Sequence, residues 1–285
     1  MAPVREALTS AVDALAAVGV DDPGLDAEVM LSEATGWERA ALVASPTTEV
    51  PPPAARLFGE MVRRRLRREP VAYIVGSKGF RRIELGVDPR VLIPRPETEL
   101  LVEVALERAP RTVLDVGTGS GAIALAIADE LPGCAVTATD TSERALAVAR
   151  ANAERLGLAD RVQLLSGTVP EGEQFDLVLA NLPYIAERDW ASLQPEVTQW
   201  EPREALLAGA DGLDAIRAFL DGCGRAFGRH PSQTSAAPLA ASAIALEIGE
   251  GQAPAVGKLM AEAGFAEIET RQDLAGIDRV VLGER

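Results

Sequence analysis

The chain has 285 residues, of which 47% are hydrophobic and 25% charged, so it is long enough for one large globular domain or two smaller ones. Its 28 Lys and Arg residues and 43 Asp and Glu residues give a net charge of −15, which argues against tight nucleic-acid binding unless one patch is locally basic. Two distant cysteines and a single histidine, His230, argue against a disulfide framework, a metal site and Ser-His-Asp chemistry. A charged N-terminal segment and the lack of a long apolar run predict a cytoplasmic protein without a signal peptide or membrane span.

The N-terminal segment has the hydrophobic spacing of helices. Apolar residues recur every three or four positions over 4–15 and 25–34, and each stretch is followed by a glycine that can end a helix. After the breaker "SPTTEVPPP", a third stretch over 54–69 shows the same spacing. We therefore predict a helical-bundle domain over residues 1–70.

The third predicted helix carries a run of arginines: Arg63, Arg64, Arg65, Arg67 and Arg68. Such a run could dock an acidic face of a partner protein. It is equally typical of the solvated side of a helix. The sequence leaves both interpretations open.

Glycine-broken apolar runs over residues 71–94 predict a β-hairpin linker. Beyond residue 95, the short apolar runs "TVLDVG", "AVTATD", "VQLLSG", "FDLVLAN" and "AIALEIG" alternate with helical stretches. This alternation indicates an α/β fold with a mostly parallel sheet and crossover helices. The segments "EIETRQD" and "RVVLGER" are expected to add two closing strands, one antiparallel, and the polar stretch 228–243 is interpreted as a mobile surface loop.

A glycine-rich turn, "LDVGTGSGAIALAIA", follows the first of these strands. Gly117, Gly119 and Gly121 allow a sharp turn and a close approach to a ligand, and the helix that follows offers free N–H groups. Asp140 ends the next strand, where its carboxylate can bind both hydroxyls of a ribose. The pattern also fits a dinucleotide-binding fingerprint, so an NAD-dependent dehydrogenase remains an alternative.

The fourth strand ends in "NLPY", which favours a different chemistry. Asn181 lies at the carboxyl end of the strand, where open α/β sheets bind ligands. Pro183 biases Leu182 towards an extended conformation, so the Leu182 carbonyl and the Asn181 amide oxygen could together accept both N–H groups of a planar NH₂. Tyr184 could stack on that plane. Such a pocket suits methyl transfer from S-adenosylmethionine to an amide or exocyclic amine nitrogen.

These motifs together resemble class I (Rossmann-like) methyltransferases that modify planar NH₂ groups. Within that class, "LIPRPETELLVE" before the sheet and "RREPVAYIVGSKGF" at the domain junction are similar to the HemK/PrmC family. The resemblance covers nearly the whole chain. It implies a mostly parallel seven-stranded sheet over residues 95–285, a substrate-recognising helical domain over 1–70 and a hairpin linker over 71–94. It also implies methylation of the glutamine side-chain nitrogen (N5) in the Gly-Gly-Gln motif of peptide chain release factors, with S-adenosylhomocysteine as product.

The resemblance assigns roles to particular positions. Asn181, Leu182, Pro183 and Tyr184 are expected to bind the substrate amide and to align it for catalysis. Arg95 and Glu97 of "IPRPET" are expected at the substrate site, paired with each other, with Thr98 or Glu97 capping the next helix. The expected cofactor-binding residues are Gly117, Thr118, Gly119, Ser120, Gly121, Asp140, Thr168 and Asn181.

The chain departs from the family pattern at two positions in these motifs. Leu182 replaces a usual proline but keeps the carbonyl acceptor, and "SGT" at Ser166–Thr168 lacks an aspartate often found near the adenine. Ribosomal RNA adenine N6-methyltransferases also carry "NLPY", but they require a basic surface and lack "IPRPET". A cofactor-binding scaffold without activity is a further alternative. The preferred prediction is a bacterial, monomeric enzyme that acts on release factors and binds no metal, nucleic acid or membrane.

Overall fold

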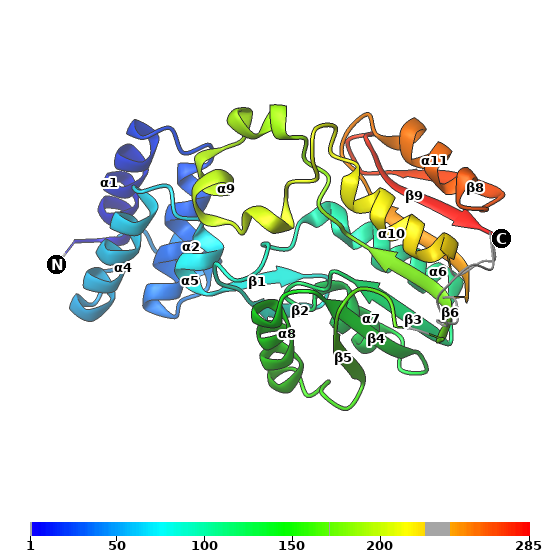
Figure 1. Ribbon diagram of the computed structural model, residues 1–285. Helices are drawn as coiled ribbons and strands as arrows, with labels where there is room; N and C mark the ends of the chain where they lie inside the picture. Colours follow the sequence, from blue (N-terminus) through cyan, green and yellow to red (C-terminus); the bar gives the residue numbers. More distant parts are fainter. Residues whose placement is uncertain (1, 171, 226–239) are drawn as a thin grey trace. The chain divides into compact units, whose positions relative to one another are not determined.

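The computed structural model describes residues 2–170, 172–225 and 240–285, and its ribbon is drawn in Figure 1. The chain forms two compact units. The helical unit comprises Met1–Ser77 together with Gln194–Trp200, and the sheet unit comprises Lys78–Leu193 together with Glu201–Arg285. The first limit falls between the predicted boundaries at residues 70 and 94, and the helical unit also includes Gln194–Trp200.

The helical unit contains the three predicted helices, α1 (Val4–Ala17), α2 (Pro23–Thr35) and α4 (Pro52–Arg65). The unit is completed by three short helices, α3 (Arg39–Ala44), α5 (Val71–Val75) and α9 (Pro195–Trp200). Asp22 caps α2, since its carboxylate accepts a hydrogen bond from the Leu25 N–H at 3.0 Å. The apolar stripes of α1, α2 and α4 meet in one core that includes Leu15, Met30 and Phe58.

The segment Val71–Val75 is a helix, so the prediction of β-structure from residue 71 was wrong. Its β-branched residues favour a strand, but Tyr73 and Ile74 are buried when the segment coils. Arg64 stabilises the end of this helix by donating to the carbonyls of Tyr73 and Ile74, both at 3.1 Å. Tertiary burial and this cap outweigh the local propensity. The predicted hairpin exists but is shorter, with β1 (Ser77–Phe80) and β2 (Ile83–Gly86).

The sheet unit is built on a seven-stranded sheet in the order β5-β4-β3-β6-β7-β9-β8. The strands from β3 to β7 are parallel where they pair, and β9 is antiparallel to both of its neighbours, as predicted. The strand bounds are β3 (Thr112–Val116), β4 (Ala135–Asp140), β5 (Val162–Ser166), β6 (Gln174–Ala180), β7 (Ala240–Glu247), β8 (Glu267–Gln272) and β9 (Asp278–Glu284).

Helices cover both faces of this sheet. The crossover helices are α6 (Glu99–Arg108), α7 (Ala122–Glu130), α8 (Glu143–Arg155), α10 (Asp214–Arg225) and α11 (Ala253–Glu262). Leu114 and Val116 of β3 pack in one core with Ile216 of α10 and Val256 of α11. Because side chains alternate along a strand, the residues between them face the other side, where α6 and α7 contact the sheet. Three short 3₁₀ helices, η1 (Pro96–Thr98), η2 (Glu187–Ser192) and η3 (Arg203–Ala205), lie in the connections.

The part of the predicted surface loop around His230 that covers 228–239 lies outside the described residues. Its last four residues, 240–243, were predicted wrongly: they begin β7, where the small side chains of Ala241 and Ala243 are buried. Across the part of the chain that the structure describes, we find no helix with the length and apolarity needed to cross a bilayer.

Candidate active site

The sheet reverses its strand order between β3 and β6, and this is the point at which open α/β sheets bind ligands. In the strand register, Val116 of β3 pairs with Ala180 of β6, and Ala180 pairs with Leu246 of β7. The residues at the carboxyl ends of three neighbouring strands are therefore a glycine, an asparagine and a glutamate: Gly117, Asn181 and Glu247. The topology brings the two predicted motifs to one edge of the sheet.

The glycine turn between β3 and α7 has the backbone that only glycine adopts readily. Gly117, Gly119 and Gly121 have φ values of 76°, 57° and 85°. A Cβ atom on Gly121 would lie 2.8 Å from Leu125 Cδ1, so that glycine also allows close packing of the turn on α7. A Cβ atom on Gly117 would lie 3.5 Å from Leu182 Cδ2 and 3.7 Å from the Asn181 carbonyl oxygen. The glycine turn thus lies against "NLPY".

Below the turn lies a buried carboxylate, Asp115, which the sequence analysis did not single out. Its Oδ2 atom accepts hydrogen bonds from the Thr118 hydroxyl at 2.6 Å and from the Ala124 N–H at 3.2 Å. Its Oδ1 atom is buried and has no partner among the described residues. Burial raises the pKa of Asp115 to about 7, against the lowering effect of these two hydrogen bonds. Because the Thr118 hydroxyl donates to Asp115, its hydrogen is not free to bind a cofactor.

Asp140 lies at the end of β4, as predicted. Its Oδ2 atom accepts a hydrogen bond from the Gly119 N–H at 2.9 Å, and its Oδ1 atom accepts one from the Ser142 N–H at 2.8 Å. Each carboxylate oxygen keeps a second lone pair, so the group can still bind a diol. The nearby carbonyl of Thr168 accepts a hydrogen bond from the Thr139 hydroxyl, which holds the predicted adenine-side loop to the end of β4. Asp140 therefore both supports the glycine turn and presents acceptors beside it.

"NLPY" follows β6 and is anchored at both ends. The Asn181 Nδ2 atom donates a hydrogen bond to Thr98 Oγ1 at 3.0 Å. The Tyr184 hydroxyl donates to Glu247 Oε1 at 3.2 Å, and the Tyr184 carbonyl accepts from Gln252 Nε2 at 3.0 Å. Burial, together with the neighbouring Glu247 carboxyl group, raises the pKa of Tyr184, so its hydroxyl stays protonated as a donor.

The "IPRPET" segment is arranged differently from the prediction. Arg95 pairs with the buried Glu201 at 2.5 Å, not with Glu97, and Glu201 also accepts from the Ile93 N–H at 3.2 Å. Thr98 makes no side-chain cap to α6 and binds Asn181 instead. The expected Arg95–Glu97 pair was therefore wrong. Thr98 does occupy the N-cap position of α6, and Glu97 lies in the first turn of η1, but the Thr98 side chain makes no capping hydrogen bond. The segment is instead tied to Glu201 and to the asparagine of "NLPY".

Glu247 is a second site residue that the sequence analysis missed, although "AIALEIG" ends a buried strand as "AVTATD" does. The side chain is 1% exposed, and burial raises its pKa to about 7. The Thr98 and Tyr184 hydroxyls oppose this rise, and the charge of Glu97 adds to it. Its Oε2 atom is buried without a partner at hydrogen-bonding distance in the described part of the chain.

The site has the donors and acceptors that S-adenosylmethionine requires. The left-handed glycine turn leaves room for a ligand backbone, Asp140 offers carboxylate oxygens for a ribose, and the unpaired Asp115 Oδ1 is an acceptor beneath the turn. The described residues include no group of three or more His, Cys, Asp or Glu side chains that could hold a metal ion. The fit is therefore to an organic cofactor bound at the glycine turn.

Comparisons with known proteins indicate the same family. Residues 6–76 match the PrmC N-terminal domain and residues 96–198 match the methyltransferase small domain. Release factor glutamine methyltransferase of Caulobacter vibrioides is 41% identical over 98% of this chain and 95% of its own length. The enzymes of that name from Geobacter sulfurreducens and Moorella thermoacetica are 40% and 42% identical, over 98% and 99% of this chain and 96% and 98% of their own lengths.

Solved structures support the fold. The hMettl16 catalytic domain aligns with a TM-score of 0.54 at 15% identity, over 70% of this chain and 74% of that domain. A methyltransferase from Pyrococcus furiosus aligns with a TM-score of 0.50 at 16% identity, over 70% of this chain and 87% of its own. At such low identity these likenesses concern the fold alone.

Proposed function

This chain belongs to the release factor glutamine methyltransferase family, and we propose that it methylates the side-chain amide nitrogen (N5) of the glutamine in the Gly-Gly-Gln motif of peptide chain release factors. The observation that carries the proposal is the contact between the two motifs. The glycine turn and "NLPY" lie so close that a Cβ atom on Gly117 would be within 3.7 Å of the Asn181 carbonyl oxygen. A cofactor on the turn and an amide on "NLPY" would therefore be neighbours.

The chemistry asks the protein to align a weak nucleophile, because the lone pair of an amide nitrogen is delocalised into its carbonyl. When bound, S-adenosylmethionine supplies a methyl group on a positively charged sulfur. Asn181 Oδ1 and the Leu182 carbonyl accept the two N–H groups of the substrate amide, and the ring of Tyr184 stacks on its plane. As positive charge grows on the nitrogen, these two acceptors bind it more strongly than they bind the ground state, which lowers the barrier. Alignment of this kind contributes up to roughly 7–11 kcal/mol.

The cofactor contacts in this proposal come mostly from the backbone. Gly117, Gly119 and Gly121 let the chain approach the cofactor, Thr118 and Ser120 contribute through their main chain, and Asp140 binds the ribose. The two hydroxyl-bearing residues are buried at 5% and 3% exposure, which supports a structural use of their side chains. Thr168 lies on the adenine side, and Arg95 and Glu97 line the substrate side.

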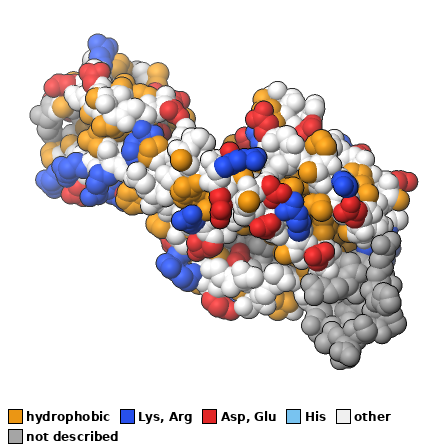
Figure 2. All heavy atoms as spheres, turned by 45° about the horizontal axis from the view of Figure 1, so that its top comes forward, with side chains coloured by type: hydrophobic (Ala, Val, Ile, Leu, Met, Phe, Trp, Pro, Cys, Tyr) orange, Lys and Arg blue, Asp and Glu red, His pale blue; other side chains and the backbone are white. Residues whose placement is uncertain are grey.

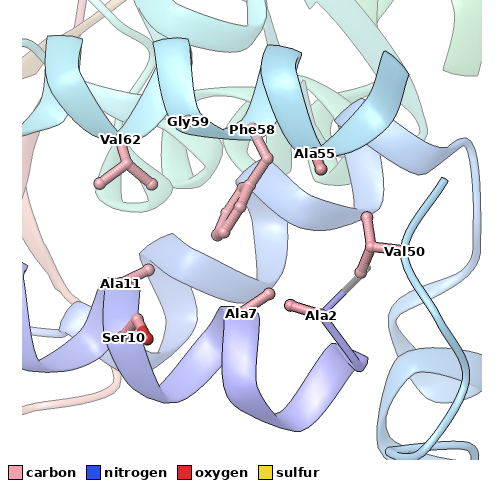
Figure 3. A pocket seen from close by; sticks show the side chains of 9 residues that line it. All are labelled: Ala2, Ala7, Ser10, Ala11, Val50, Ala55, Phe58, Gly59 and Val62. Carbon is pink, nitrogen blue, oxygen red and sulfur yellow. The ribbon is translucent and has the colours of Figure 1, made fainter. Parts of the chain in front are cut away.

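The helical unit is assigned to recognition of the release factor. It carries four of the five exposed large apolar side chains among the described residues, which are Val18, Leu25, Val43 and Leu57. It also has an apolar groove of about 280 Å³ between α1 and α4, with Phe58 and Val62 facing Ala7 and Ala11 (Figure 3). A hydrophobic groove of this kind is one of the recurring ways in which proteins receive a partner segment.

A protein substrate is favoured over RNA, and the enzyme is expected to work as a monomer in the cytoplasm without binding nucleic acid. The net charge of −15 opposes binding to a phosphate backbone. On the face drawn in Figure 2, basic and acidic side chains are interspersed, and no continuous basic surface is formed there. The NAD-dependent alternative has no support from the family relationship.

The proposal is tested by incubating the protein with methyl-labelled S-adenosylmethionine and a purified bacterial release factor. We expect label on the glutamine of the Gly-Gly-Gln peptide, located by mass spectrometry, and no label on a release factor in which that glutamine is replaced by alanine. Ribosomal RNA serves as a parallel substrate. Label on the RNA, or equal label on the alanine variant, would overturn the assignment.

A further inference from the structure

A chain of polar side chains connects "IPRPET", "NLPY" and the end of β7. From this arrangement we propose that Thr98 is a positioning residue, which fixes the orientation of the Asn181 amide. The inference rests on the proposed function, since it concerns the acceptor that Asn181 offers to the substrate. Thr98 and Glu247 touch neither the substrate nor the cofactor in this account.

The orientation of an asparagine side chain matters because its two ends have opposite character. The oxygen accepts hydrogen bonds and the NH₂ group only donates them. Asn181 accepts a substrate NH₂ only if its oxygen, and not its own NH₂, faces the pocket. The Nδ2 atom donates to Thr98 Oγ1 at 3.0 Å, which turns Oδ1 away from Thr98. Rotation of the amide by 180° would place two donors against the two N–H groups of the substrate.

A threonine hydroxyl can donate as well as accept. Towards Asn181 it accepts, because its partner is the Nδ2 atom, which can only donate. The Thr98 hydroxyl also lowers the pKa of the nearby Glu247 carboxyl group against the effect of burial. The Tyr184 hydroxyl, at 3.2 Å from Glu247 Oε1, is held by the same carboxyl group. Thr98 therefore holds the asparagine end of "NLPY", and Glu247 holds its tyrosine end.

Burial makes this arrangement effective. Thr98 is 4% exposed and Glu247 is 1% exposed, so water does not readily replace a lost partner. Thr98 is also free for this role, because its side chain makes no cap to α6. Helix capping would have been the ordinary use of a threonine at this position. The structure instead directs the side chain to a residue 83 positions away.

The variant Thr98→Val keeps the shape of the side chain and removes the acceptor. We expect kcat for release-factor methylation to fall about tenfold, the equivalent of one hydrogen bond. The KM for the release factor and the affinity for S-adenosylmethionine should each change less than about threefold, because the surfaces that bind them are unchanged. Thr98→Ser, which keeps the hydroxyl, should recover at least a third of the wild-type kcat. Circular dichroism and thermal unfolding confirm that each variant is folded.

A double-mutant cycle separates positioning from a general structural role. If Thr98 acts only through Asn181, Thr98→Val should have no further effect on kcat in an Asn181→Ala background. Equal losses from Thr98→Val in both backgrounds would overturn the proposal. So would a Thr98→Val enzyme with wild-type kcat.

A measurement independent of activity completes the test. In ¹⁵N-labelled protein, the side-chain NH₂ signal of Asn181, assigned by its loss in Asn181→Ala, should exchange with solvent faster in Thr98→Val than in wild type. Unchanged exchange would contradict the hydrogen bond itself. If wild-type protein methylates no release factor, the proposed function fails, but this exchange experiment still decides whether Thr98 holds the amide.

Discussion

Both units bury charged side chains, but these side chains have different sets of partners in the two units. In the helical unit, Arg65 is 6% exposed and binds Asp26 and Glu196, each at 2.6 Å. Glu196 also binds Arg68 at 2.6 Å, so both of its oxygens have a cationic partner. In the sheet unit, Asp115 and Glu247 are as deeply buried, yet each has one oxygen without a hydrogen-bond partner in the described part of the chain.

This difference distinguishes buried charges that stabilise the fold from buried carboxyl groups that belong to the candidate active site. A buried carboxylate paired with two arginines has its charge neutralised and both oxygens bound, and its removal leaves uncompensated charge. An unpaired buried oxygen is costly to the fold, and such groups concentrate where binding or catalysis requires them. The two unpaired carboxyl groups lie at the carboxyl ends of β3 and β7, beside the two motifs. The paired cluster instead fastens α9 to α2 and α4 within the helical unit.

The same comparison separates the paired arginines of the run over residues 63–68 from the exposed ones. Arg64 binds Glu69 at 2.6 Å, while Arg65 and Arg68 belong to the Glu196 cluster. Arg63 and Arg67 are exposed and remain as candidates for docking an acidic partner. The two interpretations of the sequence therefore apply to different arginines of the run.

The largest expected effect comes from breaking the paired cluster. Glu196→Gln leaves Arg65 and Arg68 without their shared carboxylate, and we expect the free energy of unfolding of the helical unit to fall by about 3–5 kcal/mol. Hydrogen exchange of amides in residues 4–65 measures it. The control Arg39→Gln breaks an exposed pair with Glu28, where side-chain exposures of 49% and 29% make the expected loss at most about 1 kcal/mol. Equal losses in the two variants would contradict the distinction.

A second prediction concerns pH and the unpaired Glu247. Its pKa rises from 4.5 when unfolded to about 7 when folded, so the folded state binds the extra proton between these values. Its contribution to stability is therefore complete below pH 4.5 and is lost as the pH rises through 7. Glu247→Gln removes this dependence and should gain roughly 3 kcal/mol relative to wild type between pH 4.5 and pH 8.

Chemical denaturation of the sheet unit at the two pH values measures this gain, with the exposed Glu250→Gln as control. A stability difference between wild type and Glu247→Gln that is the same at pH 8 as at pH 4.5 would contradict the assignment.

The contribution of Glu196 to stability should change with pH in the opposite direction. Burial alone would raise the pKa of Glu196, but hydrogen bonds from Arg68 and Arg65 hold it below 4.5. The contribution of Glu196 to stability is present above pH 4.5 and is lost as the pH falls through its lowered pKa.

The third prediction addresses the cofactor. If Asp140 binds the ribose hydroxyls, Asp140→Ala should weaken S-adenosylmethionine binding by about 1.5–3 kcal/mol, as for hydrogen bonds to a charged group. Loss of the contact to the Gly119 N–H would loosen the turn and act in the same direction. Calorimetry measures the affinity, and Asp129→Ala, an exposed aspartate of α7, is the matched control. Unchanged affinity in Asp140→Ala would remove Asp140 from the site.

The smallest expected effect concerns docking by the exposed arginines. Arg63→Ala combined with Arg67→Ala should raise the KM for the release factor about threefold at low salt, with cofactor affinity unchanged, because exposed charges contribute less than about 1 kcal/mol. The exposed pair Arg5→Ala and Arg56→Ala lowers the charge of the same unit equally and serves as control. A KM that changes equally in both double variants would indicate long-range charge and not docking.

The parallel strands, the three long helices and the ligand-binding ends of β3, β4 and β6 could all be predicted from the sequence, because each has a local signature. The helix α5 could not, since burial of Tyr73 and a cap from Arg64 decide it against local propensity. Glu247 could have been found by the rule that identified Asp140, an acid at the end of a buried strand. The Thr98–Asn181 bond joins residues 83 positions apart, and no local pattern indicates it.

Asn181 is the residue on which the account depends most. In Asn181→Ala the substrate amide loses an acceptor whose strength grows along the reaction, which typically costs about 2.7–4 kcal/mol, or roughly 10²–10³ in kcat. Single-turnover methyl transfer to a release factor, with cofactor affinity measured in parallel, is the most direct test. The account predicts a rate reduced by roughly 10²–10³ with cofactor affinity little changed. Methyl transfer by Asn181→Ala at the wild-type rate would contradict it and leave "NLPY" as a turn without a catalytic role.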